Sequence, residues 1–113
     1  MNRESNAAST APQHFVVLFF PSSHVIDQDF ADQAQRAAAA LEAACVAKPV
    51  PIKSLKVQVG FLVRGTFPAI QRAMEDALAS TSPYFIARIE SPCAAPGLRD
   101  TQRYLKAAGL SPP

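Results

Sequence analysis

The sequence predicts an α+β fold, a two-layer sandwich of strands and helices in the order βαββαβ with an extra C-terminal helix. The continuous apolar run 15–20 is typical of a central strand that is covered on both faces. Apolar residues recur at helical spacing over 28–44. Pro49 and Pro51 lie just before a strand-like run at 57–63. Because proline has no backbone N–H, this pair indicates an edge strand beside a regular central one.

The size and composition indicate one ordinary globular domain. A chain of 113 residues can bury a core without metal or disulfide staples. Its net charge of +2 requires neither nucleic acid nor a membrane as partner. Residues 1–13 are small and polar, which predicts a disordered tail ahead of a single domain over 14–113. No apolar run is long enough to span a bilayer, so we expect a cytoplasmic protein.

The first half of the chain alternates strand and helix. The strand 15–20 ends at Pro21, and a helix over 28–44 follows, with a buried face made mostly of alanine. A short edge strand is expected at 46–52, followed by a tight connection at 53–55. The residues assigned to the buried face of the helix are Phe30, Ala34, Ala37, Ala38, Leu41 and Cys45.

The second half repeats the pattern. Apolar side chains alternate over 57–63, as in a strand, and Thr66 is a good N-cap for an amphipathic helix that ends before Ser80. The next strand, 84–90, is expected to direct Phe85, Ala87 and Ile89 to the core and Arg88 and Glu90 to solvent, as suits the other edge. A short helix at 98–108 closes the domain, with Gly109 and Leu110 as a Schellman cap.

This order is the split βαβ, or ferredoxin-like, pattern. It predicts the strand order 4-1-3-2, with strands one and three central and parallel. Parallel strands would bring both strand-to-helix loops to one end of the sheet, where two helix N-termini favour an anion. The anion-site residues predicted there are Ser22, Ser23, His24, Arg64 and Thr66. The alternative is that these residues only cap helices, form turns or lie exposed.

Positive charge gathers in the middle of the chain. Between Glu42 and Glu75 every charged residue is basic. A solvated basic face is the ordinary explanation, and an anion-binding surface is the alternative. The residues concerned are Lys48, Lys53, Lys56, Arg64 and Arg72.

Several kinds of chemistry fit poorly. Ser23 and His24 are adjacent and rarely meet as nucleophile and base, and neither Asp27 nor Asp29 is placed to orient them. His14, His24, Cys45 and Cys93 fall on different elements without metal-ligand spacing, so no metal or cofactor is expected. Nucleic acid is not an expected partner, because the outward positions of the third strand carry no aromatic residue (Gln58, Gly60, Leu62 and Arg64). Both cysteines are expected to be reduced and inert.

Three short motifs resemble a small uncharacterised bacterial family described as sulfur or selenium carriers. They are Phe20-Pro21-Ser22-Ser23-His24, Pro49-Val50-Pro51-Ile52-Lys53 and Val59-Gly60-Phe61-Leu62-Val63-Arg64, within roughly residues 14–90. The cysteine of that family aligns with Val59, and valine cannot carry a persulfide or selenide. The resemblance therefore implies the fold rather than the carrier chemistry.

The sequence leaves three classes of function open. We expect foremost a non-enzymatic binding or interaction module, with a small anion as its ligand. The alternatives are a divergent sulfur-carrier-like protein using Cys45 or Cys93, and a small enzyme with its site at the Ser23/Arg64 end.

One partner is expected from the apolar pattern of the first strand. Phe15, Val17 and Phe19 point one way and Val16, Leu18 and Phe20 the other, while two helices can cover one face of the sheet only. A second copy packed on the uncovered face would give a homodimer. The competing cover is the C-terminal helix, through Leu98, Tyr104 and Leu105.

Overall fold

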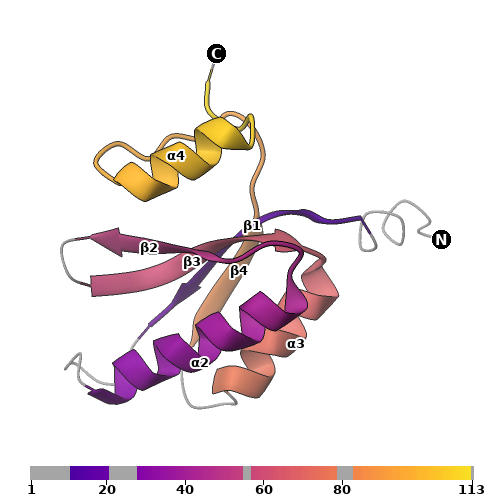
Figure 1. The fold of residues 1–113 in the computed structure, drawn as a ribbon, viewed down its shortest axis with the longest axis vertical. Helices are drawn as coiled ribbons and strands as arrows, with labels where there is room; N and C mark the ends of the chain where they lie inside the picture. The colour runs from indigo at the N-terminus through magenta and orange to yellow at the C-terminus, as the bar shows by residue number, and fades with distance from the viewer. Residues whose placement is uncertain (1–10, 21–27, 55–56, 79–82, 113) are drawn as a thin grey trace.

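The computed structural model describes residues 11–20, 28–54, 57–78 and 83–112. Four antiparallel strands form one sheet in the order β2-β3-β1-β4, with two helices on one face and a third on the other (Figure 1). The elements in chain order are β1 Gln13–Phe19, α2 Gln28–Ala44, β2 Val50–Ser54, β3 Val57–Gly65, α3 Phe67–Leu78, β4 Tyr84–Arg88 and α4 Arg99–Ala107. The predicted order of elements and of strands is confirmed. The expected tail lies outside the described residues up to position 10.

The expectation that strands one and three are parallel is wrong. β1 and β3 run antiparallel, with His14 opposite Arg64 at one end and Leu18 opposite Gly60 near the other. The reason lies in the connections: the α2 crossover makes β1 and β2 parallel, and the direct β2–β3 connection then reverses the chain. The end of β1 and the end of β3 therefore lie at opposite ends of the sheet.

The two edge strands are those predicted, with different details. β2 begins at Val50 rather than at residue 46. In β4 the predicted facing is wrong: Tyr84 and Ile86 pack toward the core, whereas the side chain of Phe85 is 54% exposed. Phe85 lies opposite Leu18, on the face that α2 and α3 do not cover. Alternation alone could not choose between the two faces, because β4 carries apolar residues at consecutive positions.

The main core lies between the sheet and the pair α2–α3. Phe15, Val17 and Phe19 of β1, which the alternation places on one side of the strand, are buried there. The buried positions of α2 are largely alanine, which lets the helix approach its neighbours closely. The other buried members of this core are Leu41, Phe61, Val63, Ile70, Ala73, Met74 and Leu78.

Helix α4 lies on the opposite face of the sheet, beside β2 (Figure 1). Its Leu105 is 3% exposed, and the sheet residue Leu62 on this face is 2% exposed. The Schellman cap is confirmed: Gly109 has a φ of 75°, its N–H donates to Lys106 O, and Leu110 N–H donates to Leu105 O. The C-terminal helix therefore covers part of the face that was expected to receive a second copy.

Part of the remainder of that face is exposed, while Val16 and Leu18 are half-buried. Beside Phe85, the side chain of Phe20 is 45% exposed. Homodimer formation thus stays a prediction, restricted to what α4 leaves open. Among the described residues, no helix is long and apolar enough to cross a membrane.

Candidate functional site

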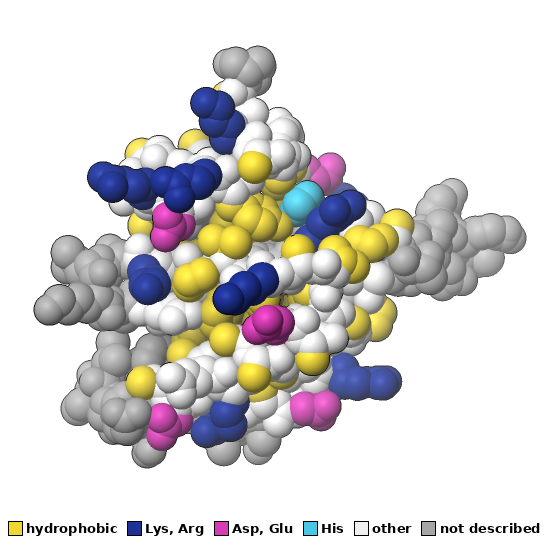
Figure 2. Space-filling model, in the orientation of Figure 1, with side chains coloured by type: hydrophobic (Ala, Val, Ile, Leu, Met, Phe, Trp, Pro, Cys, Tyr) yellow, Lys and Arg dark blue, Asp and Glu magenta, His cyan; other side chains and the backbone are white. Residues whose placement is uncertain are grey.

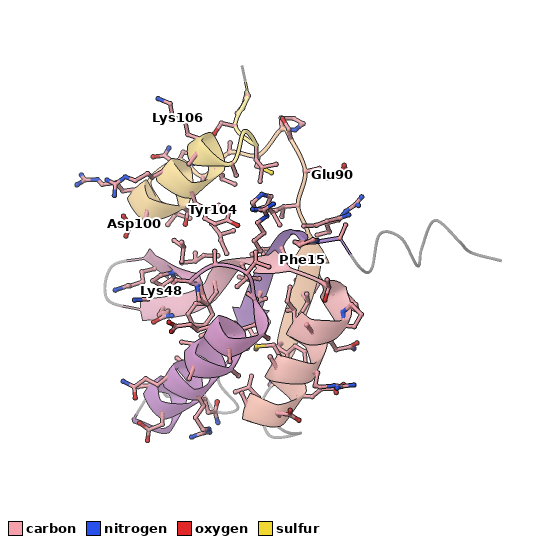
Figure 3. The ribbon with its side chains drawn as sticks, turned by 45° about the vertical axis from the view of Figure 1, so that its right-hand side comes forward. Phe15, Lys48, Glu90, Asp100, Tyr104 and Lys106 are labelled. Carbon is pink, nitrogen blue, oxygen red and sulfur yellow. The ribbon has the colours of Figure 1, made fainter. Side chains whose placement is uncertain are left out.

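The candidate site begins with a histidine and a tyrosine from distant parts of the chain. His14 lies near the start of β1, and Tyr104 points from α4 toward the sheet (Figure 3). The Nδ1 atom of His14 and the hydroxyl oxygen of Tyr104 are 2.6 Å apart, and the two rings meet edge to face at 88°. In the neutral Nε2–H tautomer, the tyrosine hydroxyl donates to Nδ1. The pair is partly buried, so each ring is oriented by the other.

A cation lies next to this pair. Arg64 is directly opposite His14 in the β1–β3 register, and its side chain is exposed. Burial, and then the positive charge of Arg64, lower the pKa of His14. Burial raises the pKa of Tyr104, while Arg64 acts on it in the opposite direction. His14 and Tyr104 are therefore neutral hydrogen-bonding groups in the field of a guanidinium at neutral pH.

The ion pairs of the described residues do not include Arg64. They join Arg88 to Glu90 at 2.6 Å and Arg103 to Asp100 at 3.7 Å. Figure 2 shows the imidazole, in cyan, at the surface beside basic side chains and next to hydrophobic ones. At this site, the guanidinium of Arg64 has no ion-pair partner among the described residues, lies beside the two neutral rings of His14 and Tyr104, and borders hydrophobic side chains.

Cys45 approaches the same end of the sheet from the end of α2. A Cβ added to Gly65 would lie 3.4 Å from Cys45 Sγ, and Val46 N–H donates to Arg64 O at 2.9 Å. An added Cβ at position 65 would make ordinary van der Waals contact with Cys45, so this approach does not depend on glycine. Burial raises the pKa of the Cys45 thiol, which keeps it protonated at neutral pH.

The second cysteine lies in the connection between β4 and α4. Cys93 is partly buried, and its thiol donates to Glu90 O at 2.9 Å. Both cysteines are free thiols in this structure. Among the described residues, no group of His, Cys, Asp and Glu could hold a metal ion.

The residues predicted as an anion site are not brought together by the sheet in the way the sequence suggested. Arg64 is the second-last residue of β3, and Thr66 directly precedes α3 at the same end. Ser22, Ser23 and His24 lie outside the described residues. The predicted convergence of the two strand-to-helix loops assumed that β1 and β3 are parallel, and they are antiparallel.

His14 and Tyr104 take the place of the predicted loop residues beside Arg64. The sequence treated His14 only as an unlikely metal ligand and Tyr104 only as a cover for the sheet. The correct strand direction would have revealed half of the site, because an antiparallel pairing places the end of β3 beside the start of β1. No local pattern indicated Tyr104, which is 90 residues away from His14.

The surface has other hollows with less distinctive chemistry. A groove of about 610 Å³ runs between α2 and α3, and alanine lines much of it. A hollow of about 430 Å³ lies between β2 and the start of α4, with Lys53, Arg99 and Asp100 in its walls. The mixed charges of the second hollow and the small apolar side chains of the first do not select a ligand.

Comparisons with known proteins give no family for this chain. No protein-family model matches it, and neither the curated proteins nor the solved structures contain a match.

Proposed function

We propose that this protein is a small non-enzymatic binding module of the ferredoxin-like type, which takes an anionic ligand beside Arg64 and His14. The observation that supports this function is the exposed guanidinium of Arg64, which forms no ion pair with the described residues and stands next to two polar rings. A guanidinium recognises planar or tetrahedral oxyanions through paired N–H donors. The neutral Nε2–H of His14 adds a further donor in the same field.

The ligand should be coupled to the protonation of His14. Arg64 lowers the pKa of His14, and an anion between the two would offset that positive charge. Bound anion therefore raises the pKa of His14. By linkage, the anion binds more tightly as the pH falls through that pKa, because the protonated imidazole adds a second positive charge.

Titration with inorganic phosphate and sulfate, followed by amide chemical shifts at constant ionic strength, tests this function. We expect saturable shifts confined to the residues around His14, Arg64 and Tyr104. Arg64→Gln should abolish them, while the matched variant Arg72→Gln, which removes an exposed arginine on α3, should keep them. Shifts that are equal in both variants, or that rise linearly over the whole surface, would exclude a site at Arg64.

The sulfur-carrier alternative needs a reactive thiolate, and Cys45, the cysteine near the site, does not favour one. Val59 occupies the position of the family cysteine in the resemblance, and the raised pKa of Cys45 disfavours its thiolate. Rapid reaction of either cysteine with an electrophile near neutral pH would favour a carrier over a binding module. The small-enzyme alternative assumed parallel central strands, whereas β1 and β3 are antiparallel, and Ser23 lies outside the described residues.

A further inference from the structure

β4 is an edge strand, so alternate backbone N–H and C=O groups of β4 face away from the sheet. Two hydrogen bonds define which groups face β1: Phe20 N–H donates to Pro83 O, and Ile89 N–H donates to His14 O. In an antiparallel pair, successive residues direct their N–H and C=O groups to opposite sides. Residues 83, 85, 87 and 89 therefore bond to β1. The backbone groups of Tyr84, Ile86 and Arg88 point away from the sheet.

The two edges of the sheet are not equally protected. The same alternation can be followed from β4 across β1 and β3 to β2, where it directs the backbone of Pro51 away from the sheet. Because proline has no N–H, this outward position lacks a donor. Lys53, two residues later, adds a positive charge to the same edge strand. β4 has no proline within Tyr84–Arg88, and every outward position has an N–H. Among the described residues, no strand pairs with this side of β4. Arg88 places a charge at one outward position of β4, as Lys53 does in β2, but all three outward residues of β4 keep both a backbone donor and a backbone acceptor.

Exposed aromatic surface borders this open edge. Phe85 is 54% exposed and Phe20 is 45% exposed, and both follow the alternation onto the sheet face that α2 and α3 do not cover. An edge with free backbone groups and a neighbouring aromatic side chain is a site for strand addition.

We infer that a second copy of this chain adds its β4 antiparallel to β4, across a two-fold axis at Ile86, so that the two sheets become one. This register overlaps all five residues of both strands and pairs each outward backbone group, with about six hydrogen bonds. Because the interface is isologous, one strand supplies both halves of it.

The side chains in this register are complementary. Tyr84 lies opposite Arg88 of the second copy, whose guanidinium bonds to Glu90 and Gln13 of its own chain and would present its remaining face to the ring in a cation–π contact. Burial, and then the negative charge of Glu75 on α3, raise the pKa of Tyr84, so the incoming arginine would enter a region of negative potential. On the other face, Phe85 lies opposite Ala87 of the second copy, and the small side chain leaves room for the ring. Each of these contacts occurs twice.

Amide hydrogen exchange of the unmodified protein at 10 and 500 µM, together with light scattering, tests this pairing. The mass should rise from 12.1 kDa toward twice that value. The amides of Tyr84, Ile86 and Arg88 should exchange at least tenfold more slowly at the higher concentration. Those of Phe85 and Ala87 should be slow at both, because β1 already holds them. A 12.1 kDa mass at 500 µM overturns the inference, and so does a dimer in which the outward amides still exchange rapidly.

Matched variants separate the edge from other surfaces. Phe85→Lys and Arg88→Pro should weaken the dimer at least tenfold, since the first places a charge at the interface and the second removes an outward donor without touching the β1 ladder. Arg88→Ala retains that donor and should weaken it less. Val46→Lys makes an equal apolar-to-charged change at a 58% exposed site outside β4 and should have no effect. Equal weakening by Val46→Lys and Phe85→Lys would contradict the pairing.

Discussion

Among the described residues with a shifted pKa, His14 is the one whose pKa is lowered. Its folded-state pKa lies below the ordinary 6.5, first because of burial and second because of Arg64. The unfolded chain therefore takes up a proton more readily than the folded one. The resulting stability is complete above pH 6.5 and is lost as the pH falls through the lowered pKa.

Replacement of His14 should make the fold less sensitive to mild acid. We expect the thermal midpoint of the unmodified protein to fall between pH 7.5 and pH 5, and to fall less in His14→Gln, whose amide can still accept a bond from Tyr104. Thermal unfolding followed by circular dichroism measures both. Because the carboxylates are common to both proteins, an equal loss in each would show that His14 contributes nothing to the pH dependence.

Gly60 is required by the close approach of β1 to β3. A Cβ at this position would overlap the carbonyl oxygen of Val17 and lie 2.9 Å from Leu18 Cδ2. We expect Gly60→Ala to lower the free energy of unfolding by about 1–3 kcal/mol in urea denaturation. Gly97→Ala adds a Cβ into open space at a φ of 85° and should cost only about 1–2 kcal/mol of backbone strain. A smaller loss at position 60 than at position 97 would contradict the steric explanation.

At the scale of elements, α4 is the cover of a second, smaller core. Leu105 is 3% exposed, and on the sheet below it Ile52 and Leu62 are buried as well. The helix has nine residues, so packing rather than intrinsic helix propensity stabilises it.

Truncation of Leu105 should therefore loosen α4 from the sheet. We expect Leu105→Ala to lower the free energy of unfolding by about 2–4 kcal/mol in urea denaturation, because it removes buried contacts and leaves a cavity. Lys106→Ala, at the exposed neighbouring position, should change it by less than about 0.5 kcal/mol. Similar losses in both variants would mean that α4 contributes through its helical backbone and not through this side chain.

At the scale of the whole molecule, the sheet has two unequal faces. The pair α2–α3 covers one face, whereas α4 covers the other beside β2 and leaves Phe20 and Phe85 exposed. The His14–Tyr104 contact links the two ends of the chain across a separation of 90 residues. Tyr104 therefore reaches the proposed anion site only when α4 is docked, whereas the outer edge of β4 does not depend on α4.

The sequence determined the kinds of elements, their order and the two edges. The helix Gln28–Ala44 has the predicted bounds, and the prolines before β3 did mark an edge. These features follow from local properties: helical or twofold periodicity, the missing N–H of proline, and the glycine after α4.

Only the tertiary structure decided the direction of β3 beside β1, the facing of β4 and the side of the sheet that α4 occupies. Each depends on pairing or packing between residues that are distant in the sequence, and local sequence patterns do not contain that information. Tyr84 to Ala87 are all suitable for a core, so their register with β1 chose which of them are buried. The same long-range pairing placed Arg64 opposite His14, where the proposed site lies.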